Sequence, residues 1–245
     1  MSANTIKKQV AIVTGASSGI GLGITQSLLA RGYCVVANSR SISKSMVLKP
    51  SADLLLVDGD IGKKETAIKV ADAAISHFDR IDLLVNSAGI YISKPFTEYT
   101  TEDFKSMIGT NVAGYFFITQ QTVAQMRKQK SGHIVGISTA VVDQPLAGAH
   151  ISMPVLTKST IPAFSRALAM EYVADGIRFN TISPGTVDTP LHANDDHEFL
   201  KKLNPAGRLV QVPEIVDALL YLQSATMVNG ENIRVDGGSH AGAKW

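Results

Sequence analysis

Three observations predict that this chain folds as an α/β protein around a doubly wound parallel sheet. Short runs of apolar residues alternate with longer segments of helical period along the whole sequence. A glycine-rich turn joins the first apolar run to the first helical segment. No internal repeat, low-complexity tract or polar linker interrupts the 245 residues, so we expect a single domain spanning 1–245.

The apolar runs are expected to be strands buried on both faces, because a strand with one wet face would alternate apolar and polar residues. These runs lie at 9–13, 33–37, 53–57, 82–86, 133–137, 177–182 and 232–236. The helical segments between them lie at 19–31, 63–78, 102–129, 153–174 and 213–224. Pro213 and Glu214 suit the first turn of the last of these helices.

Two segments lack a clear pattern. Residues 39–53 are polar and contain Pro50, so any helix after the second strand should be short. Residues 189–208 have no clean periodicity and come late in the chain, where a mobile flap over a site is expected.

The composition is that of a globular protein, with 45% hydrophobic and 18% charged residues. A formal net charge of +2 gives no electrostatic reason to expect nucleic acid or an anionic membrane as partner. The single cysteine, Cys34, cannot form an internal disulfide, and MSANTIKKQVAIV lacks the apolar core of a signal peptide. No apolar run reaches the length of a membrane span. We therefore expect a cytoplasmic protein with a small-molecule substrate and no metal site.

The first strand leads directly into TGASSGIG (14–21), which opens a helix. Gly15 allows a tight turn, Gly19 lets backbone amides approach a pyrophosphate, and Gly21 lets the helix pack closely on the strand. The helix N-terminus adds the positive end of a dipole. Strand, turn and helix in this order predict a dinucleotide site.

The end of the second strand indicates which dinucleotide binds. NAD sites commonly place an acidic residue here, on the ribose 2′-hydroxyl, whereas this sequence has Ser39 and Arg40. A hydroxyl beside a guanidinium suits a 2′-phosphate, so NADP(H) is favoured over NAD(H). The alternative is that Arg40 is only a solvated surface charge.

The spacing TGxxxGxG resembles the cofactor turn of the short-chain dehydrogenase/reductase family. Further similar motifs follow in the family's order: DGDI (58–61), NSAG (86–89), TNVAG (110–114), GIRFNTISPGTVDTP (176–190), PAGRLVQVPEIVDALLYL (205–222) and VDGG (235–238). The resemblance covers nearly the whole chain. It implies a Rossmann-type fold, a nicotinamide cofactor, hydride transfer to or from a carbonyl-like carbon, and a homodimer or homotetramer built on the helices at 102–129 and 153–174.

The resemblance also implies which residues contact the cofactor. Asp60 and the backbone of Ile61 would hold the adenine, and Lys158 would anchor the ribose. With those of the glycine turn, the expected cofactor residues are Gly15, Ser17, Ser18, Gly19, Ile20, Gly21, Ser39, Arg40, Asp60, Ile61, Asn86, Ala88, Gly89, Lys158, Pro184, Gly185, Val187 and Thr189.

By the same resemblance, the catalytic asparagine falls at Asn111, the serine at Thr139 and the lysine at Lys158. The family's tyrosine, four residues before the lysine, falls at Pro154. Proline has no titratable group and no N–H, so it cannot donate a proton. The tyrosines are at 33, 91, 99, 115, 172 and 221, so none lies between Thr139 and Lys158.

Three kinds of chemistry remain open without that tyrosine. A cationic acceptor such as an iminium needs no proton at the hydride step, and Asp143 would stabilise it unless it is only a solvated loop carboxylate. His150, Ser152 or Tyr91 would instead supply the proton, although a solvent-facing histidine is the more common case. The third possibility is a cofactor-binding protein without redox turnover. We favour an NADPH-dependent short-chain reductase with altered proton donation.

Overall fold

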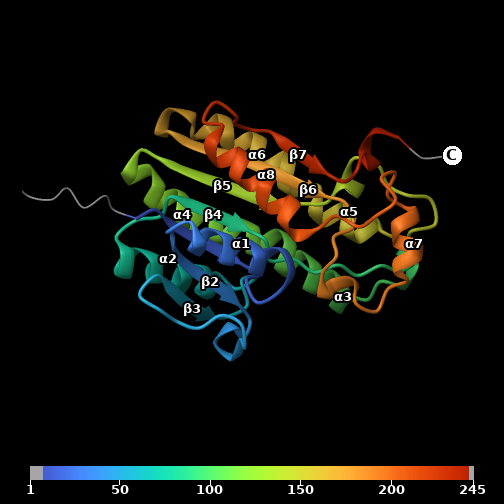
Figure 1. Ribbon diagram of the computed structural model, residues 1–245, viewed down its shortest axis with the longest axis horizontal. Helices are drawn as coiled ribbons and strands as arrows, with labels where there is room; N and C mark the ends of the chain where they lie inside the picture. The colour runs from blue at the N-terminus through green and yellow to red at the C-terminus, as the bar shows by residue number, and fades with distance from the viewer. Residues whose placement is uncertain (1–7, 243–245) are drawn as a thin grey trace, which may run out of the picture.

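Seven parallel strands form the centre of the protein in a computed structural model that describes residues 8–242 (Figure 1). Their order across the sheet is β3-β2-β1-β4-β5-β6-β7, and every neighbouring pair is parallel. The strands are β1 (Val10–Thr14), β2 (Cys34–Ser39), β3 (Leu54–Asp58), β4 (Leu83–Asn86), β5 (Gly132–Ile137), β6 (Ile177–Pro184) and β7 (Asn232–Val235). The predicted doubly wound parallel sheet is confirmed, with each strand close to its predicted position.

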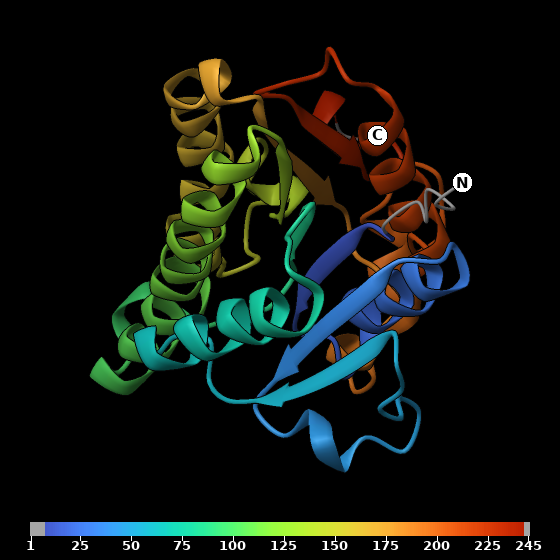
Figure 2. The same cartoon turned by 90° about the vertical axis from the view of Figure 1, so that its left-hand side faces the viewer.

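Helices cover both faces of this sheet (Figure 2). Their bounds are α1 (Gly19–Ala30), α2 (Lys64–Phe78), α4 (Gly114–Gln129), α6 (Thr160–Glu171) and α8 (Val212–Ser224). Successive residues of a strand point to opposite faces, so Ala11 and Val13 of β1 pack under α1 and α8. Val10 and Ile12 pack on the other side, under α2, α4 and α6. Two separate apolar cores therefore hold the sheet between two helical layers.

The helix predicted at 102–129 is interrupted in the structure. It consists of α3 (Thr101–Met107), a π-helical turn (Ile108–Ala113) and α4. A π turn changes the spacing of the backbone hydrogen bonds but leaves the spacing of the apolar residues nearly unchanged. The apolar pattern therefore predicted one continuous helix.

The helix predicted at 153–174 is also divided, into α5 (Ser152–Lys158) and α6, followed by a 3₁₀ turn (Val173–Asp175). Pro162 lacks the N–H that would bond to the carbonyl of Lys158 four residues earlier. That carbonyl instead accepts a hydrogen bond from the hydroxyl of Ser138, at 2.9 Å. The break thus ties the end of α5 to the residue that follows β5.

The two segments without a pattern contain short helices. Residues 39–53 hold only a 3₁₀ turn (Ile42–Lys44), as the polar sequence and Pro50 predicted. Residues 189–208 hold a 3₁₀ turn (Pro190–His192) and α7 (His197–Lys202), whose first amides are capped by the carboxylate of Asp196. The mobility expected of this segment stays a prediction.

The carboxyl ends of β1 and β4 are joined by the hydroxyl of Thr14. It donates to Oδ1 of Asn86 at 2.9 Å and accepts from the amides of Ser87 and Ala88 at 3.1 and 3.0 Å. In the sheet, β1 has β2 and then β3 on one side and β4 on the other, so the strand order reverses between β1 and β4. A crevice at such a reversal of strand order is where open α/β sheets bind ligands.

Replacing Thr14 with valine keeps the shape of the side chain but removes all three hydrogen bonds. We expect Thr14→Val to lower the free energy of unfolding by about 2–4 kcal/mol, because buried polar partners are left unsatisfied. Urea unfolding of the cofactor-free protein measures this loss.

Thr122→Val is the matched control, because Thr122 is equally buried and its hydroxyl bonds only to carbonyls of its own helix. If Thr14→Val lowers the free energy of unfolding by no more than Thr122→Val does, the proposed role of Thr14 in joining β1 to β4 is contradicted.

Candidate functional site

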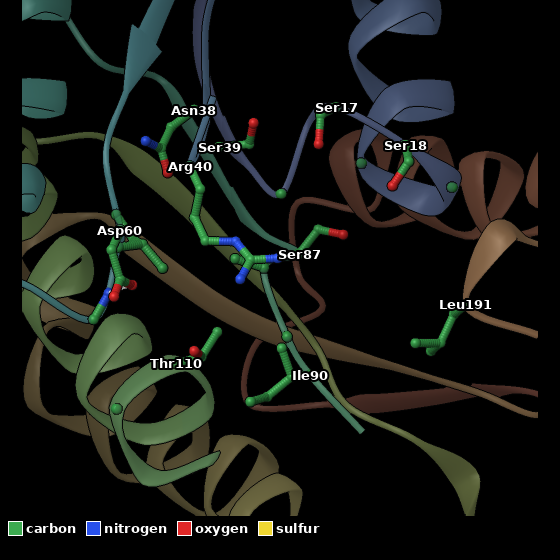
Figure 3. A pocket seen from close by; sticks show the side chains of 18 of the residues that line it. Ser17, Ser18, Asn38, Ser39, Arg40, Asp60, Ser87, Ile90, Thr110 and Leu191 are labelled. Carbon is green, nitrogen blue, oxygen red and sulfur yellow. Dashed lines mark hydrogen bonds between the residues drawn. The ribbon is translucent and has the colours of Figure 1, made fainter. Parts of the chain in front are cut away.

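A cavity of about 580 Å³ lies outside the carboxyl ends of β1, β2, β3 and β4 (Figure 3). Its walls come from the turns that follow these strands, from α3 and the π-helical turn, and from the segment after β6. It is lined by Gly15, Ser17–Gly21, Asn38–Arg40, Gly59–Lys63, Ser87–Ile90, Lys105, Ser106, Gly109, Thr110 and Thr189–Leu191.

The glycine-rich turn forms one wall of the cavity with bare backbone. Gly15 has φ of +66°, and a Cβ on it would lie 2.8 Å from Cα of Ala88. A Cβ on Gly21 would lie 2.4 Å from the carbonyl oxygen of Gly15. Side chains are thus excluded here, and Ser18 at the start of α1 makes no capping hydrogen bond. The first amides of α1 are therefore available to an anion.

The end of the cavity at β2 carries a cation and an unsatisfied acceptor. Arg40 is exposed, extends into the cavity in Figure 3 and has no ion pair within residues 8–242. The side-chain amide of Asn38 donates to the carbonyls of Val57 and Gly59, at 2.9 and 3.2 Å. Its Oδ1 is buried without a partner. A nucleotide with an anionic group near Arg40 fits this end.

Most residues expected at the cofactor come together in this cavity. Those that line it are Gly15, Ser17, Ser18, Gly19, Ile20, Gly21, Ser39, Arg40, Asp60, Ile61, Ala88, Gly89 and Thr189. Asn86, Pro184 and Val187 are buried beside it rather than on its surface. Gly185 lines a different cavity, described below.

Lys158 lies immediately behind the cavity wall and is only 8% exposed. Its Nζ donates to the carbonyl of Ile137 at 3.0 Å, and a Cβ on Gly89 would lie 2.6 Å from it. Burial lowers the pKa of Lys158 to about 8. No carboxylate within residues 8–242 pairs with this amine.

Asn111 connects the loop after β4 to α5. Its Oδ1 accepts from the amide of Ile90 at 2.9 Å, while its Nδ2 donates to the Ile90 carbonyl and to Oγ1 of Thr157, both at 3.0 Å. The side chain of Asn111 is therefore fully engaged in positioning neighbours. It lies in the π-helical turn, a local structure that often marks functional sites.

Pro154 is buried in the first turn of α5, where its missing N–H costs little. The carbonyl four residues earlier belongs to His150 and is free to bond elsewhere. It accepts from the amide of Lys94 at 3.1 Å and from the hydroxyls of Ser93 and Tyr99 at 3.3 Å. The proline is thus part of a contact between the loop before α5 and the segment after β4.

The other candidate groups are dispersed. Thr139 follows β5 and its hydroxyl has no partner in the described part of the chain. Asp143 forms an ion pair with Arg234 at 2.8 Å, so its charge is already balanced. His150 is exposed with φ of +48°. Tyr91 is half-buried, and burial raises the pKa of its phenol to about 12.

A second cavity of about 210 Å³ lies on the other side of Gly185. It is enclosed by the loop after β5, the start of the segment after β6, the end of α7 and the C-terminal segment. Its lining residues are Ala140, Val141, Gln144, Leu146, Gly185, Thr186, Lys202–Pro205, Ser239 and Gly242.

Several residues at the first cavity were not expected from the sequence. Asn38 immediately precedes Ser39 and could have been found from the position of β2 alone. Lys63 follows the DGDI motif. Lys105 is brought to the cavity by the packing of α3, which no local motif signals.

The comparisons with known proteins agree with this geometry. A family model described as Enoyl-(Acyl carrier protein) reductase matches residues 15–240. An uncharacterised oxidoreductase of Staphylococcus epidermidis is 32% identical over 233 residues, which are 94% of this chain and 97% of that protein.

Solved structures are similar over the same extent. The 3-ketoacyl-(acyl-carrier-protein) reductase from Brucella melitensis, complexed with NADH, is 26% identical with a TM-score of 0.90, covering 96% of this chain and 100% of that one. A gluconate 5-dehydrogenase from Burkholderia cenocepacia, in complex with NADP and tartrate, is 27% identical with a TM-score of 0.87 and covers 96% of each chain.

Lys158→Met should stabilise the cofactor-free protein, because it removes a buried charge that has no counter-ion. Between the folded pKa of about 8 and the ordinary value of 10.5, the unfolded chain binds more protons, so the wild type gains stability as pH rises. The variant should therefore exceed the wild type by up to about 3 kcal/mol below pH 8, and this charge-dependent excess should disappear by about pH 10.5. Urea unfolding across this pH range measures the difference.

Lys128→Met, at an exposed position of α4, provides the control and should show no comparable pH dependence. A pH-independent difference between Lys158→Met and the wild type would contradict the lowered pKa.

Proposed function

This chain belongs to the short-chain dehydrogenase/reductase family, and we propose that it is an NADPH-dependent reductase with altered proton donation. Its acceptor is an imine, an iminium or another carbonyl-type compound that needs little proton from the protein. The observation that carries this proposal is the first turn of α5, where buried Pro154 stands one turn before buried Lys158 and provides no acid.

The first cavity supports a bound NADP(H). The bare turn at Gly15 and Gly19 leaves space and amides for the pyrophosphate, and Asn38 lines the end of the cavity at β2. Arg40 suits a 2′-phosphate because it makes no ion pair with any residue between 8 and 242. The two similar structures described above contain different cofactors, NADH in one and NADP in the other.

The bound nicotinamide would supply the hydride, while residues of this chain bind and orient the reactants. Lys158 and Gly89 form the wall against which the ribose would rest, and Asn111 holds the loop that carries Gly89 and Ile90. The unpaired hydroxyl of Thr139 follows β5 and is the remaining candidate to orient the acceptor.

Proton supply distinguishes the possible acceptors. Hydride addition to a ketone creates an alkoxide, and a positioned acid contributes roughly two to four powers of ten to such a rate. The Tyr91 phenol, with a pKa of about 12, is a weak acid, and His150 is exposed. An iminium ion becomes a neutral amine when its carbon accepts hydride. This step needs no proton, so the missing tyrosine does not slow it.

We also propose that the protein is a homodimer or homotetramer. Phe104, Phe116, Leu156 and Met170 are large apolar side chains that remain exposed on α3 to α6, and Phe116 stacks on Phe164 of α6. Apolar side chains gathered on neighbouring helices are typical of an interface between copies. Within the described residues no helix is long and apolar enough to cross a membrane. The cytoplasmic location stays a prediction from the sequence.

Arg40→Ala tests the choice of cofactor. We expect the dissociation constant of NADPH to rise roughly 10- to 100-fold, because a charge-assisted contact to phosphate is lost. NADH lacks that phosphate and should change little. Fluorescence titration measures both constants, and Arg31→Ala, at the far end of α1, serves as control. An equal loss for both cofactors would show that Arg40 does not bind a 2′-phosphate.

The reaction itself is tested with NADPH and a panel of ketones, cyclic imines and activated enones, following the absorbance of the reduced cofactor. We expect turnover of imines and ketone reduction at least about 100-fold slower. Binding of NADPH with no oxidation across the panel would refute the reductase and favour a cofactor-binding protein without redox turnover.

Pro154→Tyr should raise ketone reduction roughly 10- to 100-fold by restoring an acid. Pro154→Phe is its control, because it adds the same ring without the hydroxyl. If the two variants reduce ketones equally, proton supply is not what limits the wild-type enzyme.

A further inference from the structure

The second cavity is lined by the apolar side chains of Ala140, Val141, Leu146, Leu203 and Pro205 together with several polar groups. Among residues 8–242, Lys202, in the last turn of α7, is the one charged residue that lines it, and no carboxylate of these residues does.

Lys202 and its neighbour Lys201 have different surroundings. Lys201 pairs with Glu198 at 2.7 Å and does not line the cavity. Lys202 has no ion pair within residues 8–242. Two nearby carboxylates already have partners, because Asp143 pairs with Arg234 and Asp236 pairs with His240. Within residues 8–242, the exposed ammonium group of Lys202 is therefore not paired with a carboxylate.

Asn204 provides a second polar group at the same wall. It is only 5% exposed, and its Oδ1 accepts the amide of Ala206 at 2.9 Å. Its Nδ2 has no partner in the described part of the protein, although the residue lines the cavity. A Cβ on Gly237 would lie 2.1 Å from Oδ1 of Asn204, so the side chain is held where it is by close packing.

The remaining walls are also tied together. With its amide nitrogen and oxygen interchanged, which satisfies both groups, Gln144 donates to the carbonyls of Ser239 and His240, both at 3.0 Å. This contact fixes the loop after β5 against the C-terminal segment, and the ion pair of Asp143 with Arg234 strengthens the same connection. The cavity is thus enclosed by segments that hold one another in place.

We propose that the second cavity binds a carboxylate carried by the acceptor itself, with Lys202 as its ion-pair partner and the Asn204 amide as its second donor. The substrate of the proposed reductase is then a small imine or carbonyl compound that bears a carboxylate. One cation and one amide match the single charge and two oxygens of a carboxylate, whereas a doubly charged phosphate would leave charge unpaired. The small volume agrees with a compact substrate.

This inference rests on the proposed function and makes it more specific. The carboxylate would pair with Lys202, whose charge has no carboxylate partner among residues 8–242, and the imine or carbonyl carbon would remain free to accept hydride. Gly185, which the family resemblance expects at the cofactor, borders this cavity. An acceptor anchored at Lys202 would therefore extend toward the hydride donor.

The test compares a cyclic imine that carries a carboxylate on the imine carbon with its uncharged methyl ester. Binding of each to the protein with NADP⁺ present is measured by ligand-observed NMR, and KM and kcat are measured with NADPH. We expect Lys202→Ala to weaken binding and raise KM of the carboxylate roughly 10- to 100-fold, with kcat and the ester little affected. Lys202→Arg should retain much of the affinity, and Lys201→Ala should change neither compound.

Equal effects of Lys202→Ala and Lys201→Ala, or equal effects on the carboxylate and the ester, would overturn the proposal. If the carboxylate binds in a way that depends on Lys202 but NADPH is not oxidised, the carboxylate site is supported. Only the proposed hydride transfer is then contradicted. Turnover of imines without dependence on Lys202 would overturn the carboxylate site and leave the reductase standing.

Discussion

The hydroxyl of Thr14 holds together the two strands between which the order of the sheet reverses. By binding Asn86 and the amides of Ser87 and Ala88, it fixes the loop after β4 against the glycine-rich turn after β1. The close approach of Gly15 to Ala88 follows from this contact. Two of the turns that line the first cavity, those after β1 and β4, are therefore held together by one buried side chain.

Two prolines shape the contacts of α5 and α6. Pro154 and Pro162 each lack an N–H, and each leaves a carbonyl of the preceding turn free. The carbonyl of His150 binds the segment after β4, and that of Lys158 binds Ser138. Proline at position 154 is thus compatible with an intact α5 and with the buried position of Lys158 in the same helix.

Patterns within short stretches predicted the sheet and many of the residues that line the first cavity. The strands follow from apolar runs, and the glycine turn and Arg40 follow from residues adjacent to strand ends. The π-helical turn and the break before Pro162 depend on hydrogen-bond spacing, which hydrophobic period does not report. The ion pair of Asp143 with Arg234 joins residues far apart in sequence, as do the walls of the second cavity. Such contacts depend on tertiary packing and left no local signal.

The central claim is that this chain transfers hydride without a proton from the protein. NADPH deuterated at its transferable position, mixed with an N-alkylated cyclic iminium in ordinary and in heavy water, tests it most directly, because this acceptor has no proton of its own to exchange. The account predicts one deuterium in the amine product, a primary isotope effect, and a solvent isotope effect near one. A large solvent isotope effect on hydride transfer, or a product without deuterium, would contradict it.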